Sequence, residues 1–163
     1  MDNVEYVRPG SVSEAVALLA EKPGKARALA GGTDLLVQLK SGRRQIDRVV
    51  DVKGIPDLTE IRVNADGSVL IGAAVPCFKV YSHPAIIAGY PGVIDSVSIV
   101  GGIAIQGRAS LGGNLCNGAP SGDTIPSMAA AGAVALIAGP SGNREVPVAE
   151  FCTGPGQTVL HPD

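Results

Sequence analysis

The spacing of apolar positions predicts three short strands and two helices in the first part of the chain. One helix follows Ser11 and ends before a Pro-Gly pair, and the other covers 35–40. Ser11 and Glu14 have the spacing of a capping box, which marks the start of the first helix. The strands are expected at 5–9, 26–30 and 49–52. This order predicts a small α/β lobe over residues 1–55.

The periodicity changes after this point and predicts a second lobe over residues 56–163. Apolar runs at 58–63 and 68–72 flank the turn sequence from Asn64 to Gly67, which is typical of an antiparallel hairpin. Helices are expected at 76–81, 83–88, 93–99 and 124–131, and further strands at 133–138 and 144–147. No element is indicated after the last of these strands.

The stretch from Arg108 to Asp123 shows neither a helical nor a strand period. Gly, Asn, Ser and Pro are so frequent in it that a loop is expected. Long loops inside compact domains are usually functional. The sequence therefore predicts a functional loop directly before the helix at 124–131.

Composition restricts the partners of the chain. Hydrophobic residues make up 45% and charged residues 17% of the 163 residues, and the net charge of -2 gives no reason to expect nucleic acid or an anionic membrane. Of the 13 basic and 15 acidic residues, 21 lie in positions 1–94 and only 7 in positions 95–163. The charge-poor second half is either well packed internally or covered by a cofactor or another chain.

Basic side chains cluster after the second predicted helix, interleaved with Asp47 and Asp51. They are Lys40, Arg43, Arg44, Arg48 and Lys53. Such a cluster is usually a solvated face, and no functional role is expected from it.

The cysteines give no indication of a metal site. Cys77, Cys116 and Cys152 are too widely spaced for a zinc site or an iron-sulfur cluster, and three free thiols suggest a reducing compartment. No apolar segment approaches the ~20 residues that span a bilayer, and the N-terminus does not have the pattern of a signal peptide. We therefore expect a cytoplasmic protein without a resident metal.

The strongest local signal is the order strand, glycine turn, helix at 26–40. Gly31 and Gly32 follow the strand, and Thr33 and Asp34 precede the helix. Glycines let a ligand approach the backbone, and the first turn of a helix offers unpaired N–H groups, so the turn suits a pyrophosphate. Alternatively, the glycines form only a tight turn and Thr33 or Asp34 caps the helix. Neither a G-x-G-x-x-G nor a G-x-x-x-x-G-K-[ST] motif is present, which argues against Rossmann and Walker-type sites.

Two glycine motifs together resemble those of a known family. Ala30-Gly31-Gly32-Thr33-Asp34-Leu35, and Ser110-Leu111-Gly112-Gly113-Asn114 followed by Asp123, are similar in sequence and order to motifs of the FAD-binding medium subunit of molybdenum hydroxylases. Carbon monoxide dehydrogenase and xanthine dehydrogenase belong to this family. The resemblance covers nearly the whole chain. It implies an α+β fold of the FAD-binding PCMH type, with a small α/β lobe, a larger lobe with a mostly antiparallel sheet, and a cofactor cleft between them.

The resemblance also implies which residues bind FAD. Backbone N–H groups of the first motif and the residues of the second would hold the pyrophosphate from the two lobes, with Ser110 and Asn114 adding side-chain donors. Asp123 would accept hydrogen bonds from ribose-type hydroxyls or polar flavin groups, although it could also cap the helix that follows. The implied set is Ala28, Leu29, Ala30, Gly31, Gly32, Thr33, Asp34, Leu35, Ser110, Leu111, Gly112, Gly113, Asn114 and Asp123.

The function implied by the resemblance is electron transfer by an oxidoreductase subunit, with no catalytic acid or base in this chain. Electrons from a molybdenum-pterin site in a large subunit would cross two [2Fe-2S] clusters in a small subunit, reduce FAD here, and pass to an external acceptor. Members of the family continue into a further small domain that is absent from this sequence. Two alternatives are a stand-alone PCMH-type flavoprotein and a flavin-free interaction module.

Overall fold

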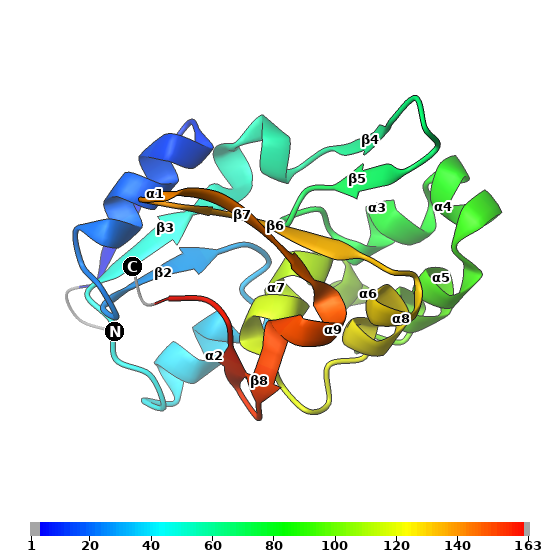
Figure 1. The fold of residues 1–163 in the computed structure, drawn as a ribbon. Helices are drawn as coiled ribbons and strands as arrows, with labels where there is room; N and C mark the ends of the chain where they lie inside the picture. Colours follow the sequence, from blue (N-terminus) through cyan, green and yellow to red (C-terminus); the bar gives the residue numbers. More distant parts are fainter. Residues whose placement is uncertain (1–3, 162–163) are drawn as a thin grey trace.

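A three-stranded parallel sheet forms the N-terminal part of the structure, a computed structural model that describes residues 4–161 (Figure 1). Its strands are β1 (Glu5–Val7), β2 (Ala26–Leu29) and β3 (Arg48–Asp51), in the order β1-β3-β2. The helices α1 (Val12–Ala20) and α2 (Leu35–Lys40) connect them. All five elements lie where the sequence predicts them. In this order β3 is the central strand, and β1 and β2 are the edge strands.

The start of α1 shows how local sequence determines these elements. Ser11 accepts a hydrogen bond from the N–H of Glu14 at 3.2 Å, which is the first half of the predicted capping box. In place of the second half, Glu14 accepts a hydrogen bond from the N–H of Gly10 at 2.8 Å. Both bonds satisfy donors at the helix N-terminus and so determine where the helix begins.

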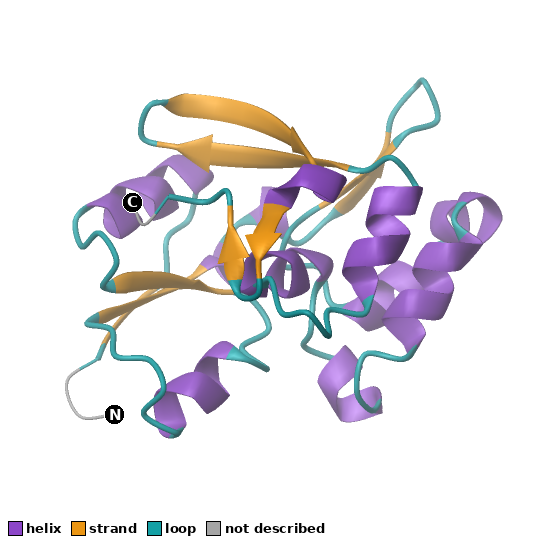
Figure 2. Ribbon diagram, turned by 60° about the horizontal axis from the view of Figure 1, so that its bottom comes forward, coloured by secondary structure: helices purple, strands orange, loops and turns teal. Residues whose placement is uncertain are grey.

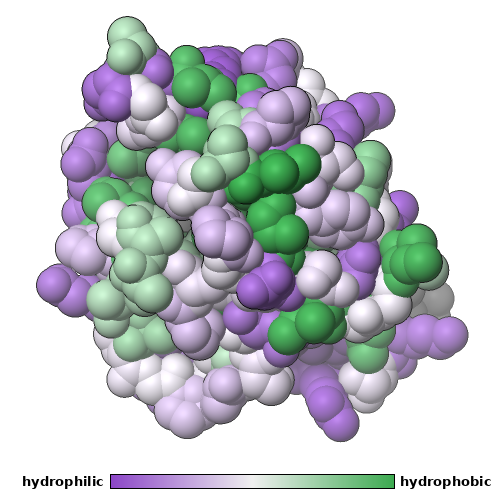
Figure 3. Space-filling model, turned by 90° about the vertical axis from the view of Figure 1, so that its right-hand side faces the viewer, coloured by the Kyte–Doolittle hydropathy of each residue, from purple (hydrophilic) through white to green (hydrophobic). Residues whose placement is uncertain are grey.

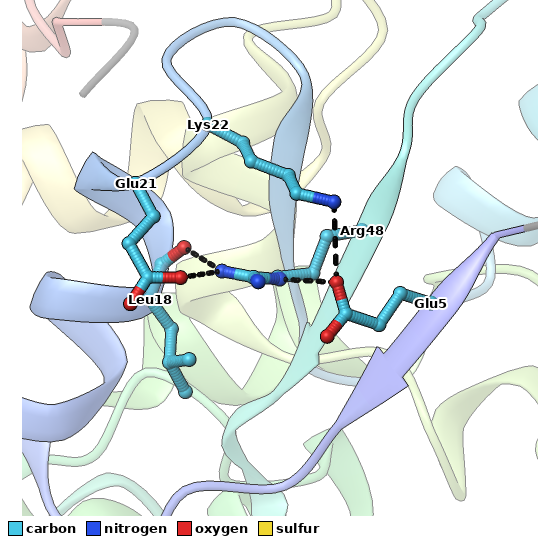
Figure 4. Close-up of polar contacts among 5 residues, drawn as sticks. All are labelled: Glu5, Leu18, Glu21, Lys22 and Arg48. Atoms are coloured by element: carbon cyan, nitrogen blue, oxygen red, sulfur yellow. Dashed lines mark hydrogen bonds and ion pairs between the residues drawn. The ribbon is translucent and has the colours of Figure 1, made fainter.

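Arg48 ties the sheet to α1 (Figure 4). Its side chain donates to Glu5 of β1 at 2.8 Å, and to Glu21 at 2.6 Å and the carbonyl of Leu18 at 2.9 Å on the α1 side. Only 7% of Arg48 is exposed. Arg48 is therefore a buried structural residue, and the expectation of a solvated face is wrong for it, because its ion-pair partners come from distant parts of the sequence.

The second part of the chain begins with two single-turn 3-10 helices, η1 (Val52–Gly54) and η2 (Pro56–Leu58), and the predicted hairpin of β4 (Ile61–Val63) and β5 (Val69–Ile71). The predicted helices follow in a compact group at the right of Figure 1. They are α3 (Cys77–Tyr81), α4 (Pro84–Gly89), α5 (Pro91–Ser98) and α8 (Thr124–Ala130), joined by α6 (Ile103–Gln106), which the sequence did not indicate.

The expectation of a loop without secondary structure from Arg108 to Asp123 is wrong. Helix α7 (Leu111–Asn117) occupies its centre. Ser110 caps this helix by accepting a hydrogen bond from the N–H of Gly113, and Gly118, with φ 58°, ends it in the left-handed conformation. Glycines lower helix propensity, but tertiary packing overrides propensity here.

The chain closes with a long hairpin and a short terminal unit. The hairpin of β6 (Val134–Gly139) and β7 (Gly142–Pro147) is as predicted, and β6 contacts α1, so the ribbon crosses over the N-terminal part (Figure 2). The final elements, α9 (Val148–Phe151), β8 (Cys152–Gly154) and β9 (Gln157–Thr158), were not predicted. Within the described residues, the strands after residue 56 pair antiparallel but form three separate two-stranded ladders, not the single sheet that was expected.

The apolar core is divided among three clusters. The largest contains Val75, Val97 and Phe151 and lies between the helices and the closing hairpin. A second joins α1 and β3 and extends to Ala74, and a third packs α2 against β2 and β3. The division into lobes at residues 1–55 and 56–163 stays a prediction.

Candidate functional site

The two glycine motifs meet in space although they are distant in sequence. Nε of Arg108, just before the second motif, donates a hydrogen bond to the carbonyl oxygen of Gly31 in the first, at 2.9 Å. A Cβ on Gly31 would overlap the carbonyl oxygen of Arg108. Gly31 therefore lacks a side chain because protein backbone fills that space, and contact of its N–H group with a ligand stays a prediction.

Unpaired backbone donors remain in the first motif. Gly32 has φ 79°, a left-handed conformation that favours glycine and turns the chain into α2. Within the described residues, no acceptor is found for the N–H groups of Gly32, Thr33 or Asp34. Asp34 stands at the N-cap of α2, but its side chain makes no capping hydrogen bond. The alternative of helix capping by Asp34 is therefore wrong, and the three N–H groups are free to bind an anion.

The second motif uses part of its residues for structure. Ser110 is only 2% exposed, and its hydroxyl oxygen is occupied by the N–H of Gly113 at 3.1 Å. Leu111 belongs to the largest core cluster. A Cβ on Gly112 would lie 2.5 Å from Cβ of Ala73, so this glycine allows α7 to pack against the segment after β5. A Cβ on Gly113 would meet only Oγ of Ser110, at 3.0 Å. Of the two glycines in this motif, Gly113 is thus the one that is not packed against another segment of the chain.

Asn114 is oriented by a buried hydroxyl. Thr124, which is fully buried, donates from Oγ1 to Oδ1 of Asn114 at 2.9 Å. This bond places the amide oxygen toward α8 and leaves the NH₂ group, for which the described part of the chain provides no acceptor, as a free donor. Asp123 stands at the N-cap of α8 without a side-chain capping bond, so the capping alternative for Asp123 is wrong.

Four of the predicted residues, Thr33, Asp34, Asn114 and Asp123, line a hollow of about 220 Å³. It is lined by Thr33, Asp34, Val100, Ile105, Asn114, Asn117, Ala119, Ser121, Gly122 and Asp123. Pockets that enclose a drug-sized ligand measure roughly 300–1,000 Å³. The hollow can therefore accept only part of an extended cofactor, such as a pyrophosphate and the groups next to it.

Some predicted residues lie away from this lining. Ala28 and Leu29 belong to β2, with Leu29 buried in the third core cluster, against which Leu35 packs. Ala30 lies between β2 and the turn. These residues form the base of the turn and do not line the hollow.

The sequence missed several lining residues. Val100 and Ile105 resemble ordinary core positions, and no signal in a single sequence distinguishes them. Asn117 lies within the stretch predicted to be functional, and its amide oxygen accepts a hydrogen bond from Gln38 of α2 at 3.1 Å. This bond adds a second link between the two sides of the hollow.

The charges around the hollow are mixed. The carboxylates of Asp34 and Asp123 line it together with the free N–H groups. Carboxylates accept hydrogen bonds from hydroxyls and repel phosphates, whereas the N–H groups and the amide of Asn114 favour an anion. The donor set therefore fits a ligand that combines a phosphate group with neighbouring hydroxyls.

A larger hollow of about 480 Å³ lies between the segment that leads from η2 into β4 and the segment from α3 to the start of α4, and none of the predicted residues line it. Ile61, Phe78 and His83 are among its lining residues.

Residues 4–161 contain no group of three or more His, Cys, Asp or Glu side chains placed to hold a metal ion. Over the same range, no helix is long and apolar enough to cross a membrane.

Comparison with known proteins shows which family the chain resembles. A family model described as the FAD binding domain in molybdopterin dehydrogenase matches residues 2–163. The chain is 35% identical over 162 residues to the xanthine dehydrogenase FAD-binding subunit of Escherichia coli O157:H7, covering 99% of this chain and 55% of that one. It is 33% identical over 156 residues to the carbon monoxide dehydrogenase medium chain of Hydrogenophaga pseudoflava, covering 96% of this chain and 54% of that one.

The fold is also that of a solved relative. The structure of carbon monoxide dehydrogenase from Hydrogenophaga pseudoflava matches with a TM-score of 0.94 at 32% identity, over 98% of this chain and 55% of that one. The expected mixed α+β fold is thereby confirmed. The chain spans about half the length of the relatives that it matches.

Proposed function

The chain belongs to the family of FAD-binding domains of molybdopterin dehydrogenases, and we propose that it binds FAD in the hollow between its two glycine motifs. The observation that carries the proposal is the convergence of free donors from both motifs. The N–H groups of Gly32, Thr33 and Asp34 come from one side and the amide of Asn114 from the other. Such donors suit a pyrophosphate without requiring a Lys or Arg in either motif.

Each predicted residue then has one of two roles. Gly32, Thr33, Asp34, Gly113 and Asn114 would contact the cofactor, with backbone or amide donors directed at the pyrophosphate. Asp123 would accept hydrogen bonds from hydroxyl groups next to it. The N–H of Gly31 would continue this donor set. The other predicted residues would form the framework of the turn and of helix α7: Ala28, Leu29, Ala30, Leu35, Ser110, Leu111 and Gly112.

The redox chemistry would be supplied by the cofactor, since a bound flavin accepts electrons and passes them on. The residues of this chain bind it, orient it and exclude water from one side. We propose that the chain is the flavin-carrying part of a molybdenum hydroxylase, as in the xanthine and carbon monoxide dehydrogenases that it resembles. Its partners would be a large molybdenum-pterin subunit and a small subunit with [2Fe-2S] clusters, and its electrons would go to an external acceptor.

The surface of the second half supports a role in a complex. Several large apolar side chains there are exposed, among them Ile99, Ile103 and Leu136, with Ile103 84% exposed. Figure 3 shows apolar patches separated by polar residues on the face formed by the helices at the right of Figure 1. Exposed apolar surface with little charge is typical of protein contacts.

Binding of FAD by the purified chain tests the proposal. We expect the Gly113→Leu variant to bind FAD at least tenfold more weakly than the wild-type chain in a fluorescence titration, because its side chain would occupy ligand space. Gly92→Leu is the matched control, since Gly92 also lies in a helix with nothing within 4 Å of an added Cβ. Equal affinity of wild type and Gly113→Leu would contradict this location.

The same preparation distinguishes the two alternatives. Turnover of a small substrate by the chain alone would indicate a stand-alone flavoprotein. Association with partner subunits without any FAD binding would indicate a flavin-free interaction module.

A further inference from the structure

Two successive carbonyl groups of the first glycine motif accept hydrogen bonds from cationic side chains outside both motifs. Nζ of Lys53 donates to the carbonyl oxygen of Ala30 at 2.9 Å, and Nε of Arg108 donates to that of Gly31 at 2.9 Å. Lys53 comes from η1, after the central strand β3, whereas Arg108 precedes α7. The turn is therefore held from both sides of the hollow.

Lys53 is itself fixed in place. Its Nζ also donates to Oδ1 of Asp51 at 2.6 Å, and its backbone N–H donates to the same oxygen at 3.0 Å. The hydroxyl of Tyr6 on β1 donates to the other carboxylate oxygen of Asp51. The Asp51 side chain is only 8% exposed, and that of Lys53 is 33% exposed. The lysine is thus preorganised by two strands of the sheet, and the expectation of a solvated face is wrong for it.

The two bonds determine where the following N–H groups point. In a planar trans peptide, the C=O and the N–H of the same unit point in opposite directions. A cation that holds the oxygen of Ala30 therefore turns the N–H of Gly31 away from Lys53. The bond from Arg108 to the oxygen of Gly31 fixes the N–H of Gly32 in the same way, and this N–H has no partner among the described residues.

We propose that Lys53 and Arg108 are positioning residues, which hold the carbonyls of Ala30 and Gly31 so that the glycine turn presents its N–H groups to the pyrophosphate. The inference rests on the proposed function of the hollow as an FAD site. It explains how a turn without a cation in its own sequence can favour an anion. Carbonyl oxygens, which would repel phosphate, are engaged by cations, and charged donors strengthen the dipoles of the peptide units they contact.

The test compares variants of Lys53 and of Arg108 with a matched control in the full 163-residue chain. Lys53→Met and Arg108→Met remove the donors but keep much of each side chain, and Lys53→Arg retains a cationic donor. Lys79→Met, at an exposed lysine of α3 remote from the turn, is the control. For each protein, the backbone amide resonances are recorded without ligand, and the dissociation constant of FAD is then measured by fluorescence titration.

We expect the Gly31 amide resonance to move in Lys53→Met and that of Gly32 to move in Arg108→Met before any FAD is added. FAD affinity should fall about tenfold in each variant, with partial recovery in Lys53→Arg and no change in Lys79→Met. Wild-type affinity in both Met variants would overturn the inference. So would a loss of affinity without movement of the two glycine resonances, since this would mean that the cations contact the phosphates directly.

The amide readout separates this inference from the proposed function. If the wild-type chain does not bind FAD, the proposed function fails, and with it the ligand role of the turn. If the wild-type chain binds FAD and only the variant effects are absent, the positioning role of Lys53 and Arg108 fails alone.

Discussion

The four glycines of the two motifs differ in why a side chain is absent at each position. Gly31 and Gly112 are pressed against protein atoms, the backbone of Arg108 and Ala73, and Gly32 has a left-handed backbone. Gly113 alone of the four has an ordinary helical backbone and nothing but one flexible hydroxyl near it. Glycines that look alike in sequence therefore separate into packed positions, a left-handed turn and one open position, which we propose faces the cofactor.

Substitution by alanine should separate Gly112 from Gly113 in stability. Gly112→Ala places a methyl group against Ala73, and overpacking of this kind destabilises by about 1–3 kcal/mol. Gly113→Ala should leave stability unchanged or raise it slightly, because alanine is the better helix former. Denaturant unfolding monitored by circular dichroism measures both. Equal stability of the two variants would show that α7 does not pack closely against Ala73.

The environment of Asp51 predicts a dependence of stability on pH. Burial alone would raise the pKa of Asp51, but hydrogen bonds from Lys53 and Tyr6 outweigh burial and hold the pKa below its usual value. A carboxyl group with a lowered pKa in the folded state contributes stability that is present above the unfolded pKa and is lost as the pH falls through the folded pKa. The loss is expected below about pH 4.

The Asp51→Asn variant tests this dependence, because it cannot titrate. Its free energy of unfolding should be lower than that of the wild type at pH 6, and the two should converge as the pH falls below about 4. The same hydrogen bond acts on Tyr6 in the opposite direction. The pKa of Tyr6 is raised by its hydrogen bond to Asp51, by burial and by the charge of Asp51. A difference between wild type and Asp51→Asn that stays constant down to pH 3 would argue against the network.

At the scale of elements, the sequence predicts the strands and helices of the N-terminal sheet and the two hairpins β4-β5 and β6-β7. These elements follow from local periodicity and turn chemistry. The prediction fails at α7, α6 and the terminal unit of α9, β8 and β9. Helix α7 carries two glycines and two asparagines, and its stability depends on the cap from Ser110 and on contact with Ala73, neither of which local propensity can reveal.

In the site, too, local sequence reveals some features, whereas others depend on tertiary contacts. The two motifs could be found from sequence, but their division into contact and framework residues depends on distances between distant segments. Lys53 shows this most clearly: in sequence it belongs to a basic cluster, and only the fold places it against Ala30.

The link between β1, β3 and α1 depends on Arg48, so its removal should loosen the sheet. Arg48→Met eliminates the hydrogen bonds to Glu5, Glu21 and the carbonyl of Leu18, leaving that carbonyl without its charged donor. We expect a lower thermal midpoint than in Arg62→Met, the matched control, because Arg62 pairs with Asp57 and Glu60 on the surface. A larger effect of the control would contradict the role of Arg48.

For the whole molecule, the hollow is where the N-terminal sheet and the helical part are joined. Arg108 to Gly31 and Gln38 to Asn117 are hydrogen bonds across it, and the free donors come from both sides. The charge-poor second half has both a large buried core and exposed apolar side chains, so internal packing explains only part of its composition. The proposed cofactor between the two parts and the proposed partner subunits on the apolar face would explain both features.

The most direct test of this account is a titration of the isotope-labelled chain with FAD, followed through its backbone amide resonances. We expect the amides of Gly32, Thr33, Asp34 and Gly113 to shift together and to saturate with one equivalent of FAD. FAD binding that leaves these amides unmoved and shifts those around the larger hollow at His83 would contradict an FAD site between the glycine motifs.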